Sequence, residues 1–175
     1  MGSLKLTTAS SGSVILSPAN TASDVTITVP ATTATMAING PAFSAYANAA
    51  NQTFTTAVIT KVVFDAEEFD TANCFDSTTN YRFTPNVAGY YQINAYLSVL
   101  STQGNFRIYK NGSEFKRGNQ SNTSNFVGYV ATALIYMNGT TDYLEMYFQQ
   151  SSGSSATSTA SSTLTYFQGF LARAA

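Results

Sequence analysis

Hydrophobic and polar residues alternate with a period of two in the strand-like runs of this chain. Between positions 142 and 149, Leu144, Met146 and Phe148 fall on one side of an extended backbone, while Tyr143 and Tyr147 fall on the other. Such alternation is typical of a strand with one buried face, and no segment shows an extended helical period. We therefore expect an all-β protein, with strands near 42–47, 57–65, 81–84, 89–100, 105–110, 125–137, 142–149 and 163–172.

Turn signals separate these runs at regular intervals. Asn111-Gly112 and Asn138-Gly139 are strong hairpin signals, because both residue types tolerate a positive φ. A further turn, from Pro85 to Gly89, comes directly before a run rich in aromatic and β-branched residues. Many short strands joined by such turns favour a two-sheet sandwich or a jelly roll.

The first 40 residues differ from the rest of the chain. Short strand-like runs occur at 4–7 and 13–18, and the segment 24–30 alternates strictly between Val or Ile and polar residues. Segments this short cannot bury their apolar faces alone, so we interpret residues 1–40 as an attachment arm and residues 41–175 as the folded domain. The candidate anchoring residues of the arm are Val14, Leu16, Val25, Ile27 and Val29.

Composition limits the kinds of partner. Charged residues make up 10% of the chain and hydrophobic residues 44%, so the surface must consist mostly of Ser, Thr, Asn and Gln. Such a surface suits a protein that works outside cells or inside an assembly. The net charge of −1 offers no electrostatic basis for binding nucleic acid, and the basic pair Lys116-Arg117 is more simply explained as a solvated turn.

Cysteine content and the N-terminal sequence bear on the cellular compartment. Cys74 is the single cysteine, so an intrachain disulfide is excluded. The first residues contain no long apolar run, and the sequence therefore predicts neither a secretory signal peptide nor a transmembrane helix. We expect a protein that is made in a cytosol, does not insert into membranes, and reaches its working place by assembly or lysis.

Candidates for catalysis or metal binding are few. Histidine is absent, which removes the usual general base and the commonest metal ligand, and Cys74 has no neighbouring base in the sequence. One group of carboxylates, expected in a loop, could serve a glycosidase or hold Ca²⁺, but it lacks a recognisable ligand spacing. We therefore assign no catalytic, cofactor-binding or metal-binding residue and expect no enzyme; Ca²⁺ stays open as an alternative. The carboxylates are Asp65, Glu67, Glu68, Asp70 and Asp76.

Three stretches of the chain resemble one fold family. The segment 81–96, the hairpin-like segment 137–144 and the ending 164–171 are similar, in this order, to parts of the C1q/TNF-like jelly roll, and the resemblance covers residues 41–175. Its most specific positions are Phe64, Asp70, Phe75, Phe83, Gly89 and Tyr91.

The resemblance implies a jelly-roll sandwich that assembles as a homotrimer, because in this family three subunits pack around an axis through one sheet. Tyrosine suits such an interface, since it combines a large contact area with a polar tip. The alternative is that the tyrosines line a solvent-facing groove. The candidate interface residues are Tyr91, Tyr143, Tyr147 and Phe167.

The segment 151–162 is of low complexity and consists mainly of Ser, Thr and Ala. Two interpretations stay open: a surface loop that recognises a ligand, and a flexible connector without a role of its own.

The arm resembles in composition the short Thr/Ala/Val/Pro segments of bacteriophage tail fibres and other virion surface proteins. We therefore expect a trimeric, non-enzymatic structural protein on the surface of a bacteriophage virion, made in the host cytoplasm: a capsid decoration, cement, head-fibre or tail-fibre protein. Its partners would be itself, the capsid or tail, and host surface glycans. Two alternatives are a secreted C1q/TNF-type module that binds a receptor or glycan, and an enzyme acting on host polysaccharide if the carboxylates form a cleft.

Overall fold

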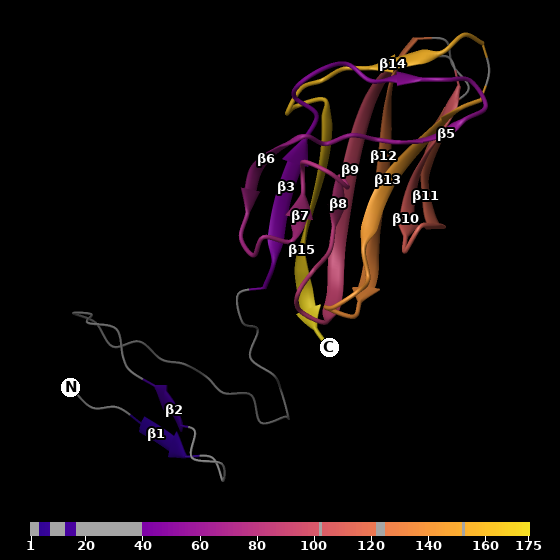
Figure 1. Cartoon of the computed structure of the whole chain (residues 1–175). Coiled ribbons are helices and arrows are strands. Elements are labelled where there is room, and N and C mark those ends of the chain that lie inside the picture. Colours follow the sequence, from indigo (N-terminus) through magenta and orange to yellow (C-terminus); the bar gives the residue numbers. More distant parts are fainter. Residues whose placement is uncertain (1–3, 8–12, 17–39, 102, 122–124, 152) are drawn as a thin grey trace. The chain divides into compact units, whose positions relative to one another are not determined.

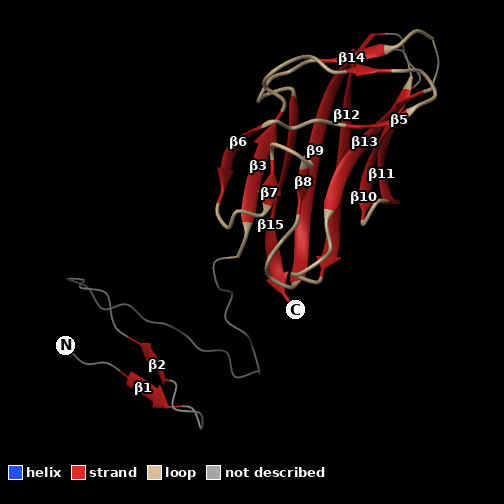
Figure 2. Cartoon of the chain, viewed as in Figure 1, coloured by secondary structure: helices blue, strands red, loops and turns tan. Residues whose placement is uncertain are grey.

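All regular secondary structure in the described residues is β-strand (Figure 2). The computed structural model describes residues 4–7, 13–16, 40–101, 103–121, 125–151 and 153–175. Within these ranges there is no helix, and hence none long and apolar enough to cross a membrane. The expected all-β class is confirmed.

The chain divides into two units, residues 1–36 and residues 37–175. In the first unit, β1 (Leu4–Thr7) and β2 (Ser13–Leu16) pair antiparallel, with Leu4 opposite Leu16. The anchoring candidates Val14 and Leu16 belong to β2. The other anchoring candidates, at positions 25, 27 and 29, lie outside the described residues.

The second unit is a sandwich of two antiparallel sheets (Figure 1). In the sheet that we call the β9 sheet, the order is β4-β14-β9-β15-β3-β6, and β12 pairs along β9 as well. Its strands are β3 (Ala42–Tyr46), β4 (Thr53–Phe54), β6 (Ala66–Asp70), β9 (Gly89–Ser101), β12 (Asn125–Met137), β14 (Ala156–Ser158) and β15 (Thr165–Ala174).

The opposite sheet, which we call the β13 sheet, has the order β11-β10-β13-β8-β7, and β5 also pairs with β13. Its strands are β5 (Ile59–Lys61), β7 (Phe75–Asp76), β8 (Arg82–Phe83), β10 (Gly104–Lys110), β11 (Ser113–Ser121) and β13 (Leu144–Gln150). The expected jelly-roll sandwich is thus confirmed for this unit.

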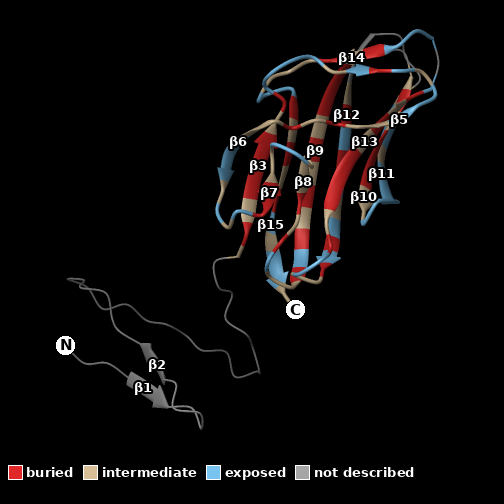
Figure 3. Cartoon of the chain, in the orientation of Figure 1, coloured by how far each residue is buried: buried red, intermediate tan, exposed pale blue. Residues whose placement is uncertain are grey.

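The core lies between the two sheets, where inward-facing side chains of successive strands meet. Figure 3 shows the buried positions along the strands of the sandwich. The ring of Phe43 stacks on that of Phe83 with centroids 4.3 Å apart, and it meets the edge of Phe167 at 4.9 Å. Leu144, Met146 and Phe148 are fully buried, as their alternation predicted. Each such side chain contributes about 1.5–3 kcal/mol by leaving water, so this aromatic and aliphatic layer holds the sheets together.

Two turns take the form that the sequence predicted. Asn111 and Gly112 have φ values of 53° and 76°, the positive pair of a two-residue hairpin, and they join β10 to β11. Strand β9 begins at Gly89, where a Cβ atom would lie 2.5 Å from the carbonyl oxygen of Arg173. The Pro85–Gly89 turn therefore ends in glycine because β15 passes too closely for any side chain.

Several strands differ from the sequence expectation. The run 57–65 forms only the three-residue β5, and the carboxylate-rich segment expected as a loop is the edge strand β6. Charged side chains are common on edge strands, where they discourage pairing with other chains. Because these charges replace the alternating apolar residues of an ordinary strand, the sequence does not indicate that β6 is a strand.

Candidate functional site

The structure separates the four tyrosine and phenylalanine residues proposed for a trimer interface. Tyr91 and Phe167 are fully buried in the core of the single subunit, so the prediction that they contact a neighbouring subunit is wrong. Both lie within aromatic doublets, and it is their neighbours that lie farther out: Tyr90 is almost half exposed and Tyr166 is partly exposed. Burial raises the pKa of Tyr91 to about 12, and its hydroxyl donates a hydrogen bond to the carbonyl of Val87 at 2.8 Å.

Tyr143 and Tyr147 do lie at the surface, half-buried, but on the β13 sheet. Their contact with another subunit stays a prediction that a single subunit does not test. They form part of a second surface, described below.

The outward side of the β9 sheet is apolar and uncovered; we call it the open face. In the register of β9 with β12, Tyr90 lies opposite Tyr136, and their rings are 5.5 Å apart. Farther along the sheet, Tyr96 stacks on Tyr166 at 5.7 Å. The exposed large apolar residues of this sheet are Phe69, Tyr90, Leu100, Val130, Leu134, Tyr136 and Phe170. Sequence alternation could have identified most of them, as the residues next to the core positions.

A polar row crosses the middle of the open face. Gln92 donates a hydrogen bond from Nε2 to the hydroxyl of Thr132 at 3.0 Å, and that hydroxyl donates to Oδ1 of Asn94 at 2.8 Å. Because these side chains bind one another, most of their polar atoms are satisfied without water. The row therefore lets the open face pack against protein despite its polar groups.

The open face is hollowed beside β15. A cavity of about 230 Å³ lies between the exposed rings of Phe69 and Phe170, with Asn94 and Gln168 in its lining. On the opposite edge, Val130 and Leu134 project from β12, with about half of their surface exposed. One edge thus offers a hollow and the other offers projecting apolar side chains.

The outward side of the β13 sheet has a different chemistry, and we call it the outer face. Glu145 is almost fully buried there and forms an ion pair with Lys61 at 2.5 Å. Tyr147 donates a hydrogen bond to the same carboxylate at 3.3 Å. Burial, and next the charge of Glu145, raise the pKa of Tyr147 to about 12, so its hydroxyl stays protonated at neutral pH.

Arginines surround these groups. Arg107 lies beside Glu114 at 3.4 Å and donates to Gln149, while the guanidinium of Arg82 lies 4.4 Å from the ring centroid of Tyr143. Hydrogen bonding from Arg117, its main partner, holds the pKa of Glu114 below the usual range.

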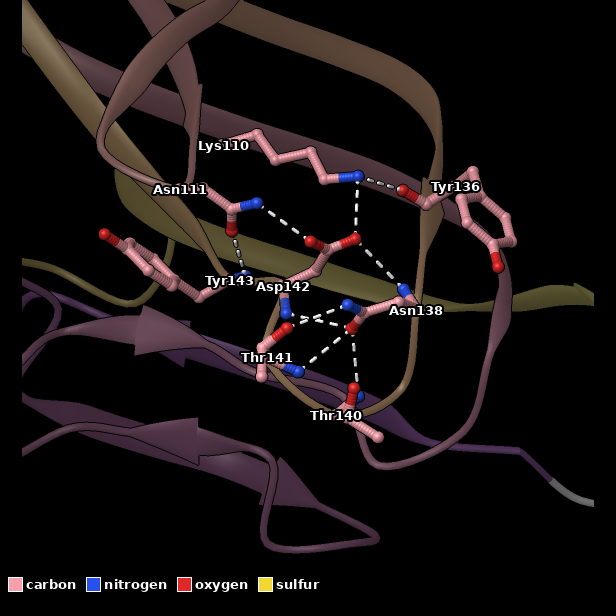
Figure 4. A network of polar contacts seen from close by, with 8 residues as sticks. All are labelled: Lys110, Asn111, Tyr136, Asn138, Thr140, Thr141, Asp142 and Tyr143. Atoms are coloured by element: carbon pink, nitrogen blue, oxygen red, sulfur yellow. Dashed lines mark hydrogen bonds and ion pairs between the residues drawn. The ribbon is translucent and has the colours of Figure 1, made fainter.

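A network of polar contacts ties two turns together at the end of this sheet (Figure 4). Asp142 accepts hydrogen bonds from the Nζ of Lys110, the Nδ2 of Asn111 and the backbone amide of Asn138, at 2.8, 2.8 and 3.0 Å. Burial alone would raise the pKa of Asp142, but these donors outweigh it and lower the pKa. The network fixes the β10–β11 turn to the β12–β13 turn.

Two of the carboxylates singled out in the sequence, Asp65 and Asp70, hold the backbone of neighbouring loops. Asp70 accepts backbone hydrogen bonds from Ala72 and Phe75, and Asp65 does the same for Asn48 and Ala49. In the described part of the chain, no three acidic or sulfur-bearing side chains form a group that could hold a metal ion. The cluster in the sequence is therefore not a cluster of free ligands in space.

Part of the Ser-rich segment is structured. Strand β14 pairs with β9 and β4, and Ala156 and Ser158 are buried. Neither a free connector nor a wholly exposed recognition loop describes these three residues. Small side chains can enter the sandwich here because they need little space.

Comparisons with known proteins agree with the two-sheet architecture. No protein-family model matches the sequence, and no curated protein matches it significantly. Among solved structures, the globular domain of the zebrafish complement 1qA protein is similar over 77% of this chain and 99% of its own, with 18% identity and a TM-score of 0.58. Eiger TNF from S. frugiperda matches over 79% and 96%, with 9% identity and a TM-score of 0.62.

Murine APRIL matches over 75% of this chain and 98% of its own, with 8% identity and a TM-score of 0.57. At these identities the comparisons establish the fold: this chain contains a C1q/TNF-like jelly roll.

Proposed function

We propose that this chain is a non-enzymatic structural protein on the surface of a bacteriophage virion, a homotrimer anchored by residues 1–40. The observation that carries the proposal is the open face, an apolar sheet surface that a lone subunit leaves in water. Contiguous exposed apolar patches of this kind are typical of protein–protein interfaces. The C1q/TNF-like fold supports a second copy of the same chain as the partner.

The two edges of the open face suit a cyclic arrangement. A threefold ring joins unlike patches of neighbouring subunits, so one part of each subunit must fit a different part of the next. The hollow between Phe69 and Phe170 and the projecting side chains Val130 and Leu134 provide two such parts. The polar row between them would be enclosed with most of its polar atoms already hydrogen-bonded to one another.

The attachment to a virion draws on the sequence. The chain has few charged residues, and its first 40 residues resemble segments of virion surface proteins in composition. Mass spectrometry of purified particles of the phage that encodes this chain tests this part directly. Absence of the chain from intact particles would contradict it.

The oligomeric state is tested by analytical ultracentrifugation at micromolar concentration. We expect a trimer for the unaltered chain and a monomer for Leu134→Lys, because the substitution places three charges in an apolar interface. Phe115→Lys is the matched control: Phe115 is similarly exposed but lies on β11 of the other sheet, and this variant should stay trimeric. A monomeric unaltered chain would contradict the proposal.

A second candidate is a secreted binding module of the C1q/TNF type. The similarity to the complement 1qA globular domain, APRIL and Eiger TNF favours it. Recovery of the chain from culture medium of its source cells, rather than from particles, would support this alternative.

A further inference from the structure

The outer face collects a large share of the charge in a chain that has little. Its outward positions carry four cations and three carboxylates, so the face keeps a small positive excess although the whole chain has a net charge of −1. Acidic residues gather instead around β6, which belongs to the β9 sheet. The outer-face cations are Lys61, Arg82, Arg107 and Arg117, and the carboxylates are Asp76, Glu114 and Glu145.

Aromatic rings occupy alternate positions between these charges. Tyr143 comes directly before β13, and Tyr147 lies four residues farther along, a separation of about 13 Å at the usual rise of a strand. The ring of Tyr109 lies 4.1 Å from that of Tyr147. The outward positions of β10 and β13 hold no aliphatic side chain; Asn105 and Gln149 fill the others.

We propose that the outer face binds a polysaccharide that carries carboxylate groups, with Arg82 and Tyr143 at the centre of the site. Tyrosine rings can pack on the apolar C–H face of a sugar, while their hydroxyl groups and the neighbouring amides can bind its hydroxyl groups. A surface that binds another protein would be expected to have a larger apolar centre. The positive charge selects acidic sugars over neutral ones.

Arg82 is the cation best placed to bind a carboxylate. Its guanidinium lies over Tyr143 and has no ion-pair partner among the residues that the structure describes. Asp76 lies opposite Arg82 in the ladder, but its oxygens already accept hydrogen bonds from the 78–80 turn. The planar guanidinium can therefore offer two parallel donors to a carboxylate.

The site remains accessible in the assembly proposed above. The outer face belongs to the sheet opposite the open face, so trimerisation would leave it in solvent. Three copies on one particle would raise the apparent affinity for a repeating polymer through multivalency. This inference rests on the proposed function for its avidity and its biological setting, whereas the site itself lies within one subunit.

The test measures binding of the full chain to immobilised polygalacturonate, with dextran as the neutral control polymer. We expect binding to polygalacturonate that weakens with added salt, and no binding to dextran. Arg82→Gln should weaken binding about tenfold, the effect of losing a charge-assisted hydrogen bond, and Arg82→Lys should fall between. The matched control Lys116→Gln removes an exposed positive charge outside the site, and its binding should stay within about twofold of the unaltered chain.

Three results would overturn the proposal: no binding to polygalacturonate, equal effects of Arg82→Gln and Lys116→Gln, or equally strong binding to poly-aspartate, which would indicate an acidic protein. A short galacturonate oligomer separates the two proposals. If the chain proves monomeric yet binds the oligomer through Arg82, the site stands and the trimer fails. If Leu134→Lys binds the oligomer normally but the immobilised polymer more weakly, both are supported.

Discussion

At the scale of single residues, several polar side chains in this protein stabilise turns through hydrogen bonds and ion pairs. Asp142 shows this most clearly, because one buried carboxylate joins Lys110, Asn111 and Asn138 from two turns (Figure 4). The side-chain oxygen of Asn138 in turn accepts hydrogen bonds from the backbone amides of Thr140 and the two residues that follow it. The asparagines of the Asn-Gly pairs thus have a second role: the side chain of Asn111 connects the two turns, and the side chain of Asn138 holds its own turn together.

The lowered pKa of Asp142 predicts a pH dependence of stability. Its carboxylate is favoured in the folded state, so the stabilisation is complete above the unfolded pKa of about 3.9 and is lost as the pH falls through the lower folded value. We expect Asp142→Asn to reduce the free energy of unfolding by about 1–3 kcal/mol at pH 7, and the difference from the unaltered chain to shrink between pH 5 and pH 2. Denaturant unfolding at a series of pH values measures this.

Glu67→Gln, on the exposed part of β6, is the control and should change stability little at any pH. An Asp142→Asn difference that stays constant down to pH 2 would show that the charge of Asp142 is not the cause.

At the scale of elements, the long strands could be predicted from the sequence and the short ones could not. Strands β9, β10, β12 and β15 match their predicted ranges within a few residues, because each has enough alternating positions to show its period. Strands of two or three residues, such as β4 and β14, carry no period. Strand β14 forms because the chain passes beside the long strand β9, and β4 then pairs with β14.

The structured part of the Ser-rich segment gives a test at this scale. Ala156→Asp should lower the free energy of unfolding by more than about 2 kcal/mol, because it buries a charge where β14 pairs with β9. It should also speed proteolytic cleavage between positions 151 and 162. Ser155→Asp changes the neighbouring exposed residue and should have almost no effect. Equal behaviour of the two variants would mean that this segment is a free connector after all.

At the scale of the whole molecule, the sequence predicted the sandwich but not which aromatic residues face inward. Tyr90-Tyr91 and Tyr166-Phe167 are doublets, and alternation cannot decide between two adjacent aromatic residues. The structure decides through particular contacts: Tyr91 reaches a turn carbonyl, and Phe167 fits against Phe43. On the outer face, the sequence predicted only that Tyr143 and Tyr147 lie at the surface; it gave no sign of Arg82, which lies over Tyr143 because β8 pairs with the distant β13.

The inward or outward position of two nearby phenylalanines gives a further prediction. In the Leu134→Lys background, where we expect single subunits, Phe167→Ala should cost about 3–5 kcal/mol of unfolding free energy, the usual cost of a buried Phe→Ala change. Phe170→Ala, half-exposed on the open face, should cost less than about 1 kcal/mol. Denaturant unfolding monitored by tyrosine fluorescence measures both.

In the chain with Leu134 intact, Phe170→Ala should raise the dissociation constant of the trimer more than Phe167→Ala does. If Phe170→Ala changed neither quantity, the hollow beside it would not be part of the subunit contact.

The uneven distribution of charge between the two sheets gives each subunit an electric dipole moment, directed from the acidic strand β6 toward the cationic outer face. Around a threefold axis, the components of three such dipoles perpendicular to that axis would cancel. The trimer would then lack a preferred orientation of its sides in an external field, and each side would present the same sign of charge to a cell wall. Such a trimer would therefore meet an anionic surface equally well with any of its three equivalent sides.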